Sequence, residues 1–329
     1  MDQSLMAALN QLGEMEKAQR RNERVVWLLG AGFSKPLGGP LFSELISERV
    51  ALWVRCWLAS KDVSDEAIHD ALNVFKKGEE LGLWENAEEC ITLINEARSD
   101  EATRAAILET IEELRNEKGL EDVERQLSRF VAAATAHFVV RALGAEQLPE
   151  AWTPYREWAK LLSGRDSIVN FNYDRVVESL FRRTEKRTAL VKLHGTVSET
   201  LWEDIRDGKP ISNIALPGPD KLRSRDEPMV SEAWEQAGTL LEQANRLVVI
   251  GYSFPASDAY ARWFILSKCR AVTVDVVLGP GEFGEAITGM FARFLGKPAV
   301  RNTRLLAQEY LAEGCARPWE DRFNHWLTY

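Results

Sequence analysis

The stretch Val25-Val26-Trp27-Leu28-Leu29-Gly30-Ala31-Gly32-Phe33-Ser34 decides the fold. Its first five residues are all apolar, which is typical of a strand buried on both faces of a sheet. The Gly-Ala-Gly turn that follows lets the backbone approach its surroundings without side chains in the way. Such a turn has two interpretations. Either its amide N–H groups, backed by the start of a helix, hold a phosphate, or the turn lets a strand and a helix pack closely.

Three later stretches repeat the pattern of an apolar run that ends in small or polar residues. They are residues 168–174 (IVNFNYD), 190–195 (LVKLHG) and 247–254 (LVVIGYSF). In open parallel sheets, ligands bind just beyond the carboxyl ends of the strands. Further strands are expected at residues 211–216 and 272–278. We therefore predict an α/β protein with a Rossmann-like, doubly wound parallel sheet.

The region between the first two expected strands has helical periodicity instead. Apolar residues recur at helical spacing from Leu41 to Trp53, and further helices are predicted at residues 67–75, 87–97, 101–114 and 123–143. We interpret residues 51–165 as a large helical insert that covers one side of the ligand cleft. An ordinary dinucleotide fold would place a strand here that ends in a ribose-binding acid, but the nearest acid, Glu48, lies within a helical pattern. This argues against a dehydrogenase.

Both ends of the chain are expected to be helical. Residues 1–24 are predicted to form an N-terminal helical arm for docking or oligomerisation, ahead of a domain that spans residues 25–329. The tail from residue 282 is expected to be mostly helical. Its residues Trp319, Phe323 and Trp326 are predicted to pack an apolar stripe onto the body.

Composition and charge exclude several classes of protein. The chain has 329 residues, of which 45% are hydrophobic, so it can bury a full core. Its net charge of −9 gives no attraction for nucleic acid, and we expect no direct nucleic-acid binding. We also expect no membrane span, because no apolar run approaches the roughly 18 residues that a spanning helix needs, and no signal peptide. The four isolated cysteines are expected to be reduced thiols of a cytoplasmic protein.

Taken together, the four stretches resemble the sirtuin-like NAD-consuming family. Residues 30–34 (GAGFS) resemble the family's Gly-Ala-Gly-x-Ser phosphate loop, and residues 38–42 (GGPLF) resemble the lid that follows it. Residues 172–174 match the family's Asn-x-Asp beside the nicotinamide ribose, and residues 192–195 match the strand end that carries the catalytic base. Residues 251–253 lie where the family has its second nucleotide loop. The motifs keep the family's order across residues 25–280.

The resemblance implies a site for NAD+ as substrate. It implies Asn172 and His194 as the catalytic residues. The residues that it places against NAD+ are Gly30, Ala31, Gly32, Phe33, Ser34, Phe42, Asp174, Gly251, Tyr252 and Ser253. We add Asp275 as a possible contact to the adenosine ribose, because it interrupts an otherwise apolar strand.

These residue types suit the cleavage of the bond between nicotinamide and its ribose. That cleavage leaves a cationic, oxocarbenium-like sugar, which the site must hold, shield and supply with a nucleophile. The amide of Asn172 has donors and acceptors that orient a ribose hydroxyl or an attacking water. His194 is able to accept a proton near pH 7, and Leu41 and Phe42 would form an apolar lid that excludes water.

Three of the residues also have a purely structural interpretation. The alternative for His194 is a hydrogen bond at a strand end, although the nearby Asn-x-Asp motif favours catalysis. The alternative for Asp174 is the N-cap of the following helix, a position that favours Asp. The alternative for Asp275 is a bond to a local backbone group.

The chain departs from protein-deacylating sirtuins at two places. Leu41 and Ser43 stand where those enzymes commonly carry an acid and an arginine. The four-cysteine zinc module that they usually carry is also missing, so no metal is expected. The cysteines occur singly, at Cys56, Cys90, Cys269 and Cys315.

The first hypothesis is therefore an NAD+ glycohydrolase that releases nicotinamide and ADP-ribose. Zinc-less bacterial sirtuin-like domains with helical inserts resemble effectors of antiphage (antiviral) defence, which implies a homo-oligomer or a defence-system partner protein. The alternatives are an NAD-dependent protein deacylase and a non-catalytic subunit that senses NAD or ADP-ribose. The missing zinc cysteines and altered lid argue against the first alternative, and the intact Asn172 and His194 argue against the second.

Overall fold

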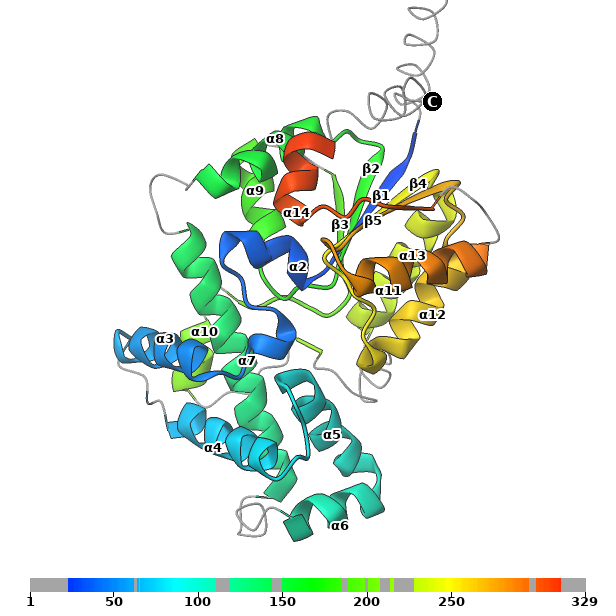
Figure 1. Ribbon diagram of the computed structural model, residues 1–329. Coiled ribbons are helices and arrows are strands. Elements are labelled where there is room, and N and C mark those ends of the chain that lie inside the picture. Colours follow the sequence, from blue (N-terminus) through cyan, green and yellow to red (C-terminus); the bar gives the residue numbers. More distant parts are fainter. Residues whose placement is uncertain are drawn as a thin grey trace, which may run out of the picture.

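The computed structural model describes residues 23–61, 64, 66–110, 119–143, 150–184, 188–198, 201–207, 214–215, 228–295 and 300–314. Its centre is a six-stranded, entirely parallel sheet with the order β3-β2-β1-β4-β5-β6 (Figure 1). This is the strand order of doubly wound dinucleotide-binding sheets, and it confirms the predicted fold class. The strands are β1 (Val25–Leu29), β2 (Asp166–Asn170), β3 (Ala189–Lys192), β4 (Arg246–Ile250), β5 (Thr273–Val277) and β6 (Val300–Asn302).

Two helical layers cover the sheet, and alternate residues of β1 face each of them. Val26 and Leu28 join a core with α11 (Pro228–Gln243), α12 (Ala259–Lys268) and α13 (Glu282–Leu295). Trp27 and Leu29 join a second core on the other face. That core includes α8 (Thr153–Leu161), α9 (Val176–Thr184), α14 (Ala307–Glu309) and η8 (Tyr310–Gly314). Because both faces are covered, β1 is apolar throughout, as its sequence indicates.

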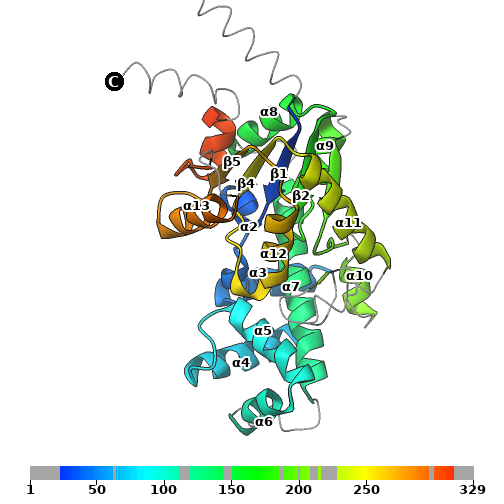
Figure 2. The ribbon, with the colours of Figure 1, turned by 90° about the vertical axis from the view of Figure 1, so that its right-hand side faces the viewer.

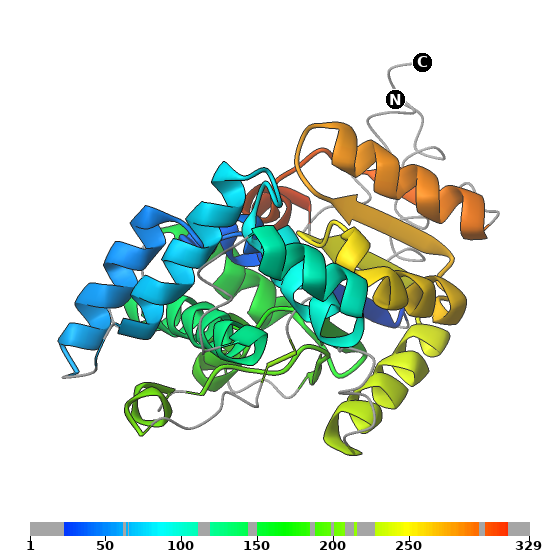
Figure 3. The same ribbon diagram turned by 90° about the horizontal axis from the view of Figure 1, so that it is seen from below.

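The predicted helical insert packs as a body of its own between β1 and β2. Its helices are α3 (Glu48–Ala59), α4 (Glu66–Glu80), α5 (Ala87–Ser99), α6 (Glu101–Thr110) and α7 (Gly119–Leu143). The long helix α7 contacts α3, α4 and α5, and these helices share a buried apolar core. In both Figure 1 and Figure 2, α6 lies at the end of the molecule farthest from α8. Figure 3 looks from the insert end and shows α3, in blue, on the side away from α11 and α13.

The structure differs from the predicted organisation at two places. Helix α8 falls within the expected insert at residues 51–165, but it packs on the sheet: Trp158 lies 5.5 Å from the Trp27 ring and 5.4 Å from the Phe33 ring. The packed insert therefore ends with α7. Strand β6 lies in the region expected to be mostly helical. Val300 is its one apolar residue, so it gives no apolar run to recognise.

Several expectations lie outside the described residues. They are the N-terminal arm up to residue 22, the packing of Trp319, Phe323 and Trp326, and most of the strand at 211–216. Within that last segment, Ile214 is described, and it forms an antiparallel bridge with Gly195. In the part of the chain that the structure describes, no helix is long and apolar enough to cross a membrane.

Glycines bring the loops after β1 and β4 into direct backbone contact. The Gly32 N–H donates to the Gly251 carbonyl at 2.9 Å, and the Gly30 N–H donates to the Ile250 carbonyl at 2.9 Å. A Cβ on Gly251 would lie 2.2 Å from the Phe33 nitrogen, and one on Gly32 would lie 2.6 Å from the Gly251 Cα. Gly251 also has a φ of +65°, which disfavours other residues. The geometry supports the close-packing interpretation of the glycine turn, here between two loops.

This contact predicts that Gly251→Ala lowers the free energy of unfolding by about 2–4 kcal/mol, because the methyl group adds overpacking to an unfavourable φ. Urea unfolding measures the change. Gly289→Ala is the matched control, since its Cβ would meet nothing within 4 Å and it lies within α13. That control should be neutral or stabilising by up to about 1 kcal/mol. If Gly251→Ala proved as stable as Gly289→Ala, the close contact between the two loops would be contradicted.

Candidate functional site

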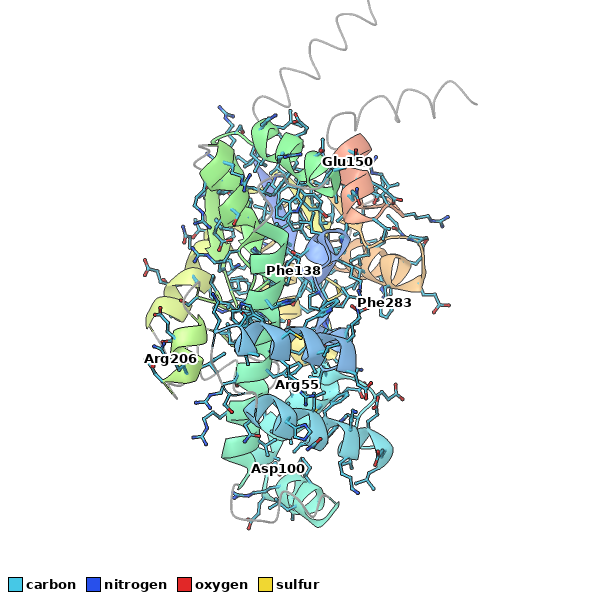
Figure 4. The ribbon with its side chains drawn as sticks, turned by 90° about the vertical axis from the view of Figure 1, so that its left-hand side faces the viewer. Arg55, Asp100, Phe138, Glu150, Arg206 and Phe283 are labelled. Carbon is cyan, nitrogen blue, oxygen red and sulfur yellow. The ribbon has the colours of Figure 1, made fainter. Side chains whose placement is uncertain are left out.

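A cavity of about 670 Å³ lies at the carboxyl ends of the central strands. This volume falls within the roughly 300–1,000 Å³ typical of ligand pockets. Every predicted site residue lines the cavity except Phe33 and Asp275. The insert contributes Phe138 from α7 to the lining, and α13 contributes Phe283. Figure 4 shows these two labelled residues on either side of the glycine-loop helix α2 (Ala31–Ser34).

Asn172 belongs to a buried hydrogen-bond network that links the loops after β1 and β2. Its Nδ2 donates to the Gly30 carbonyl at 2.9 Å and to Ser34 Oγ at 3.4 Å. Ser34 Oγ in turn donates to Asp174 Oδ2 at 2.7 Å. All three side chains are buried. The network holds the Asn172 amide in a fixed orientation in the cavity wall, as a positioning role requires.

Asp174 serves as the helix cap that the sequence left as an alternative. Its Oδ1 accepts the Val176 N–H at 3.0 Å, at the start of α9. Its other oxygen accepts the Ser34 hydroxyl, and the Lys192 ammonium contacts its carbonyl. Asp174 thus lines the cavity with both carboxylate oxygens already accepting hydrogen bonds.

His194 is buried at the base of the cavity, among aromatic rings and near a carboxylate. Its ring meets the Phe171 ring edge-on, with the centroids 4.9 Å apart. Phe171 in turn stacks on Tyr252, with the ring centroids 4.1 Å apart, so the imidazole packs against one of two stacked rings. The Nε2 atom of His194 lies 3.8 Å from Asp258 Oδ1. The site therefore offers both a base and a counter-charge for the cation that protonation would create.

Sequence reasoning missed three carboxylates in the cavity wall, Asp258, Glu88 and Glu309. The Tyr252 hydroxyl donates to Asp258 Oδ2 at 2.9 Å, and the Ser257 hydroxyl donates to Glu88 on α5. Burial raises the pKa of Tyr173 and of Tyr252 well above the usual value, and the charges of Asp258 and Glu88 raise both further. Both phenols therefore stay neutral at physiological pH. Asp258 directly precedes α12 in the chain and Glu88 lies within a predicted helix, and neither belongs to a recognisable motif.

The loop after β1 offers fewer free amides than predicted. The N–H groups of Gly30, Gly32 and Phe33 donate to the carbonyls of Ile250, Gly251 and Gly30. This corrects the expectation that these three amides hold a pyrophosphate. Phe33 is also a packing residue, because its fully buried ring lies 5.1 Å from the Tyr155 ring, and the Tyr155 hydroxyl donates to the Phe33 carbonyl at 2.7 Å.

The predicted lid forms part of the cavity wall. Leu41, Phe42 and Ser43 all line the cavity, and the Phe42 ring lies 6.3 Å from that of Tyr173. Glu44 fixes this segment, because it accepts the Leu41 N–H at 3.0 Å and pairs with the Lys35 ammonium. The lid is thereby tied to the end of the glycine loop.

Asp275 lies inside β5 and away from the cavity, which corrects the predicted ribose contact. Its Oδ1 accepts a hydrogen bond from Arg301 Nε at 3.0 Å, and its Oδ2 accepts one from the Tyr310 hydroxyl at 3.0 Å and pairs with Arg246. Burial alone would raise the pKa of Asp275, but the charges and hydrogen bonds of the two arginines outweigh it, and the pKa is lowered. The acid interrupts the apolar strand because it joins neighbouring strands through ion pairs.

Comparison with models of known protein families and with curated proteins finds no match for this chain. Residues from each of the quoted motifs meet at one cavity.

Loss of the Asp275 carboxylate is predicted to affect stability and leave NAD+ binding unchanged. Asp275→Asn should lower the free energy of unfolding by about 3–5 kcal/mol, because it leaves buried arginine charge without its partner. The lowered pKa of Asp275 means that its stabilisation is complete above about pH 4 and is lost as the pH falls through the folded-state pKa. Urea unfolding between pH 7 and pH 3 should show a flatter pH dependence in the variant. Normal stability with weakened NAD+ binding would instead restore the ribose role.

Proposed function

We propose that this protein is an NAD+ glycohydrolase, which uses water to cleave NAD+ into nicotinamide and ADP-ribose. The observation that carries the proposal is the meeting of Asn172, His194 and the lid residue Phe42 at one cavity. The cavity lies at the carboxyl ends of β1 and β4, where the strand order reverses direction and doubly wound sheets bind dinucleotides.

The charge of the cavity also favours this reaction. Among the described lining residues, the carboxylates belong to Glu88, Asp174, Asp258 and Glu309, and the ammonium group belongs to Lys35. Lys35 is paired with Glu44. A negative wall stabilises the positive charge that grows on the ribose as the bond to nicotinamide breaks. Among the described lining residues there is no unpaired cation for a phosphate group beyond those of NAD+.

In the proposed reaction, the electron pair of the bond between the ribose C1′ and nicotinamide leaves with nicotinamide. A water oxygen then bonds to C1′, and His194 takes the proton that the water loses. Asn172 orients the ribose or the water, because its amide is held by Gly30 and Ser34. The rings of Phe42, Phe171 and Tyr173 shield the cationic sugar from other water.

An enzyme of this kind would deplete the NAD+ of its own cell unless it were restrained. We therefore extend the proposal, from the family resemblance, to an effector of bacterial antiviral defence that is controlled by assembly or by a partner protein.

The reaction predicts that purified protein incubated with NAD+ alone releases nicotinamide and free ADP-ribose, identified by mass spectrometry. A parallel incubation contains an acetylated lysine peptide. Turnover that strictly requires the peptide and yields O-acetyl-ADP-ribose would replace the proposal with a deacylase. NAD+ that binds and is returned intact, by the isolated chain and by its native assembly, would replace it with a sensor.

The assigned roles predict that His194→Ala and Asn172→Ala each lower turnover by at least about a hundredfold. NAD+ affinity should fall much less, because both substitutions leave the backbone contact between the loops after β1 and β4 in place. His69→Ala is the matched control, since His69 is exposed on α4 and bonds to Arg55 away from the cavity. Turnover and calorimetric binding are measured on all three variants. Near-normal turnover in His194→Ala would assign the base to another residue.

A further inference from the structure

Asp258 occupies the N-cap position of α12 without capping it. An Asp at this position usually accepts an N–H of the first helical turn, which stabilises the helix. Here the carboxylate accepts none from the described first turn of α12. Its Oδ2 instead accepts the Tyr252 hydroxyl, and its Oδ1 lies 3.8 Å from His194 Nε2. The side chain is turned away from its helix and toward the cavity.

This orientation places a buried charge beside a titratable ring. Asp258 and His194 are each only 6% exposed. A buried carboxylate is costly without compensating partners. At 3.8 Å the contact is longer than a hydrogen bond, so it stabilises a neutral imidazole little and an imidazolium much more. The geometry therefore favours the state of His194 that exists after it has accepted a proton.

Among the described residues that line the cavity around His194, the one ammonium group belongs to Lys35, which is paired with Glu44. Tyr173, from the loop after β2, and Tyr252, from the loop after β4, are neutral phenols whose pKa is raised by burial and by nearby carboxylates. Glu88, from α5, adds a second negative charge to this wall of the cavity. Arg262, on α12, lowers the pKa of Tyr252, but this effect is smaller than those of burial, Asp258 and Glu88, which raise it.

We propose that Asp258 is the positioning residue for His194. Its charge stabilises the imidazolium that forms when the His194 ring takes a proton from the attacking water, while the electron pair of the broken O–H bond stays on the oxygen that bonds to C1′. Tyr252 fixes the carboxylate through its hydroxyl and supports the imidazole through Phe171. The catalytic part of this inference rests on the proposed glycohydrolase function, and the pairing of the two side chains does not.

Asp258→Asn tests the catalytic part, because asparagine keeps the size of the side chain and an acceptor for Tyr252 but removes the charge. We expect kcat to fall at least about tenfold and NAD+ affinity to change little. Without the carboxylate, the imidazole loses its proton at lower pH, so the acid limb of kcat against pH should move to lower pH by about one unit. Asp258→Glu should restore part of the activity.

Asp166→Asn is the matched control. Asp166 also accepts side-chain hydrogen bonds, from Trp27 at 2.9 Å and from Ser163 at 2.7 Å, but it lies at the amino end of β2, opposite the cavity. The Asp166→Asn variant should have the same kcat and the same dependence of kcat on pH as the unaltered protein. Circular dichroism and thermal unfolding verify that each variant is folded.

An NMR titration of histidine-labelled protein tests the pairing without any catalysis. The chain contains four histidines, and the His194 signal is the one that disappears in His194→Ala. Its titration midpoint should fall by about one unit in Asp258→Asn and stay unchanged in Asp166→Asn.

The two readouts separate failure of this inference from failure of the proposed function. If the unaltered protein and its native assembly leave NAD+ intact, the glycohydrolase proposal fails, while the NMR midpoint still decides whether Asp258 pairs with His194. If NAD+ is cleaved and folded Asp258→Asn keeps its turnover and pH profile, the positioning role is overturned. An unchanged midpoint in folded Asp258→Asn overturns the pairing itself.

Discussion

The backbone contact between the loops after β1 and β4 is the constraint on which the site depends. In the parallel register, Leu29 lies beside Ile250, so both loops leave the sheet at the same level. Side chains at Gly32 or Gly251 would push these loops apart. Because the loops touch, the Gly30 carbonyl is placed where Asn172 can bond to it, and the Tyr252 ring is placed where it can support Phe171. This contact therefore sets the positions of residues that line the cavity.

The helical insert is part of the cavity wall, although it has its own core. Glu88 on α5 bonds with Ser257, which directly precedes Asp258 in the chain. The insert therefore touches the same short segment that carries the proposed partner of His194. A displacement of α5 would therefore move the segment beside Asp258 through the hydrogen bond between Glu88 and Ser257. This connection gives the insert a physical route by which a binding partner could influence the proposed reaction.

The sequence was informative wherever a feature depends on neighbouring residues. Mainly apolar runs predicted β1, β2, β3, β4 and β5, and helical spacing predicted the insert. Features that depend on residues far apart in the chain were not predictable in this way. Asp275 appeared to be a ligand contact because its partners, Arg246 and Arg301, come from other strands. Asp258 was not recognised as a site residue, since only the folded chain shows that its carboxylate turns toward His194.

The central position of β1 also constrains how the chain folds. This strand is complete at Leu29, but its two partners begin only at Asp166 and Arg246. During synthesis, the most apolar strand of the sheet therefore emerges from the ribosome long before anything can pair with it. The insert is made of local helical contacts, which form faster than distant strand pairings, and we expect it to fold first. Folding of the insert would then bring the two ends of the connection between β1 and β2 close together. We expect β2 to pair with β1 before β4 pairs with the other edge of β1.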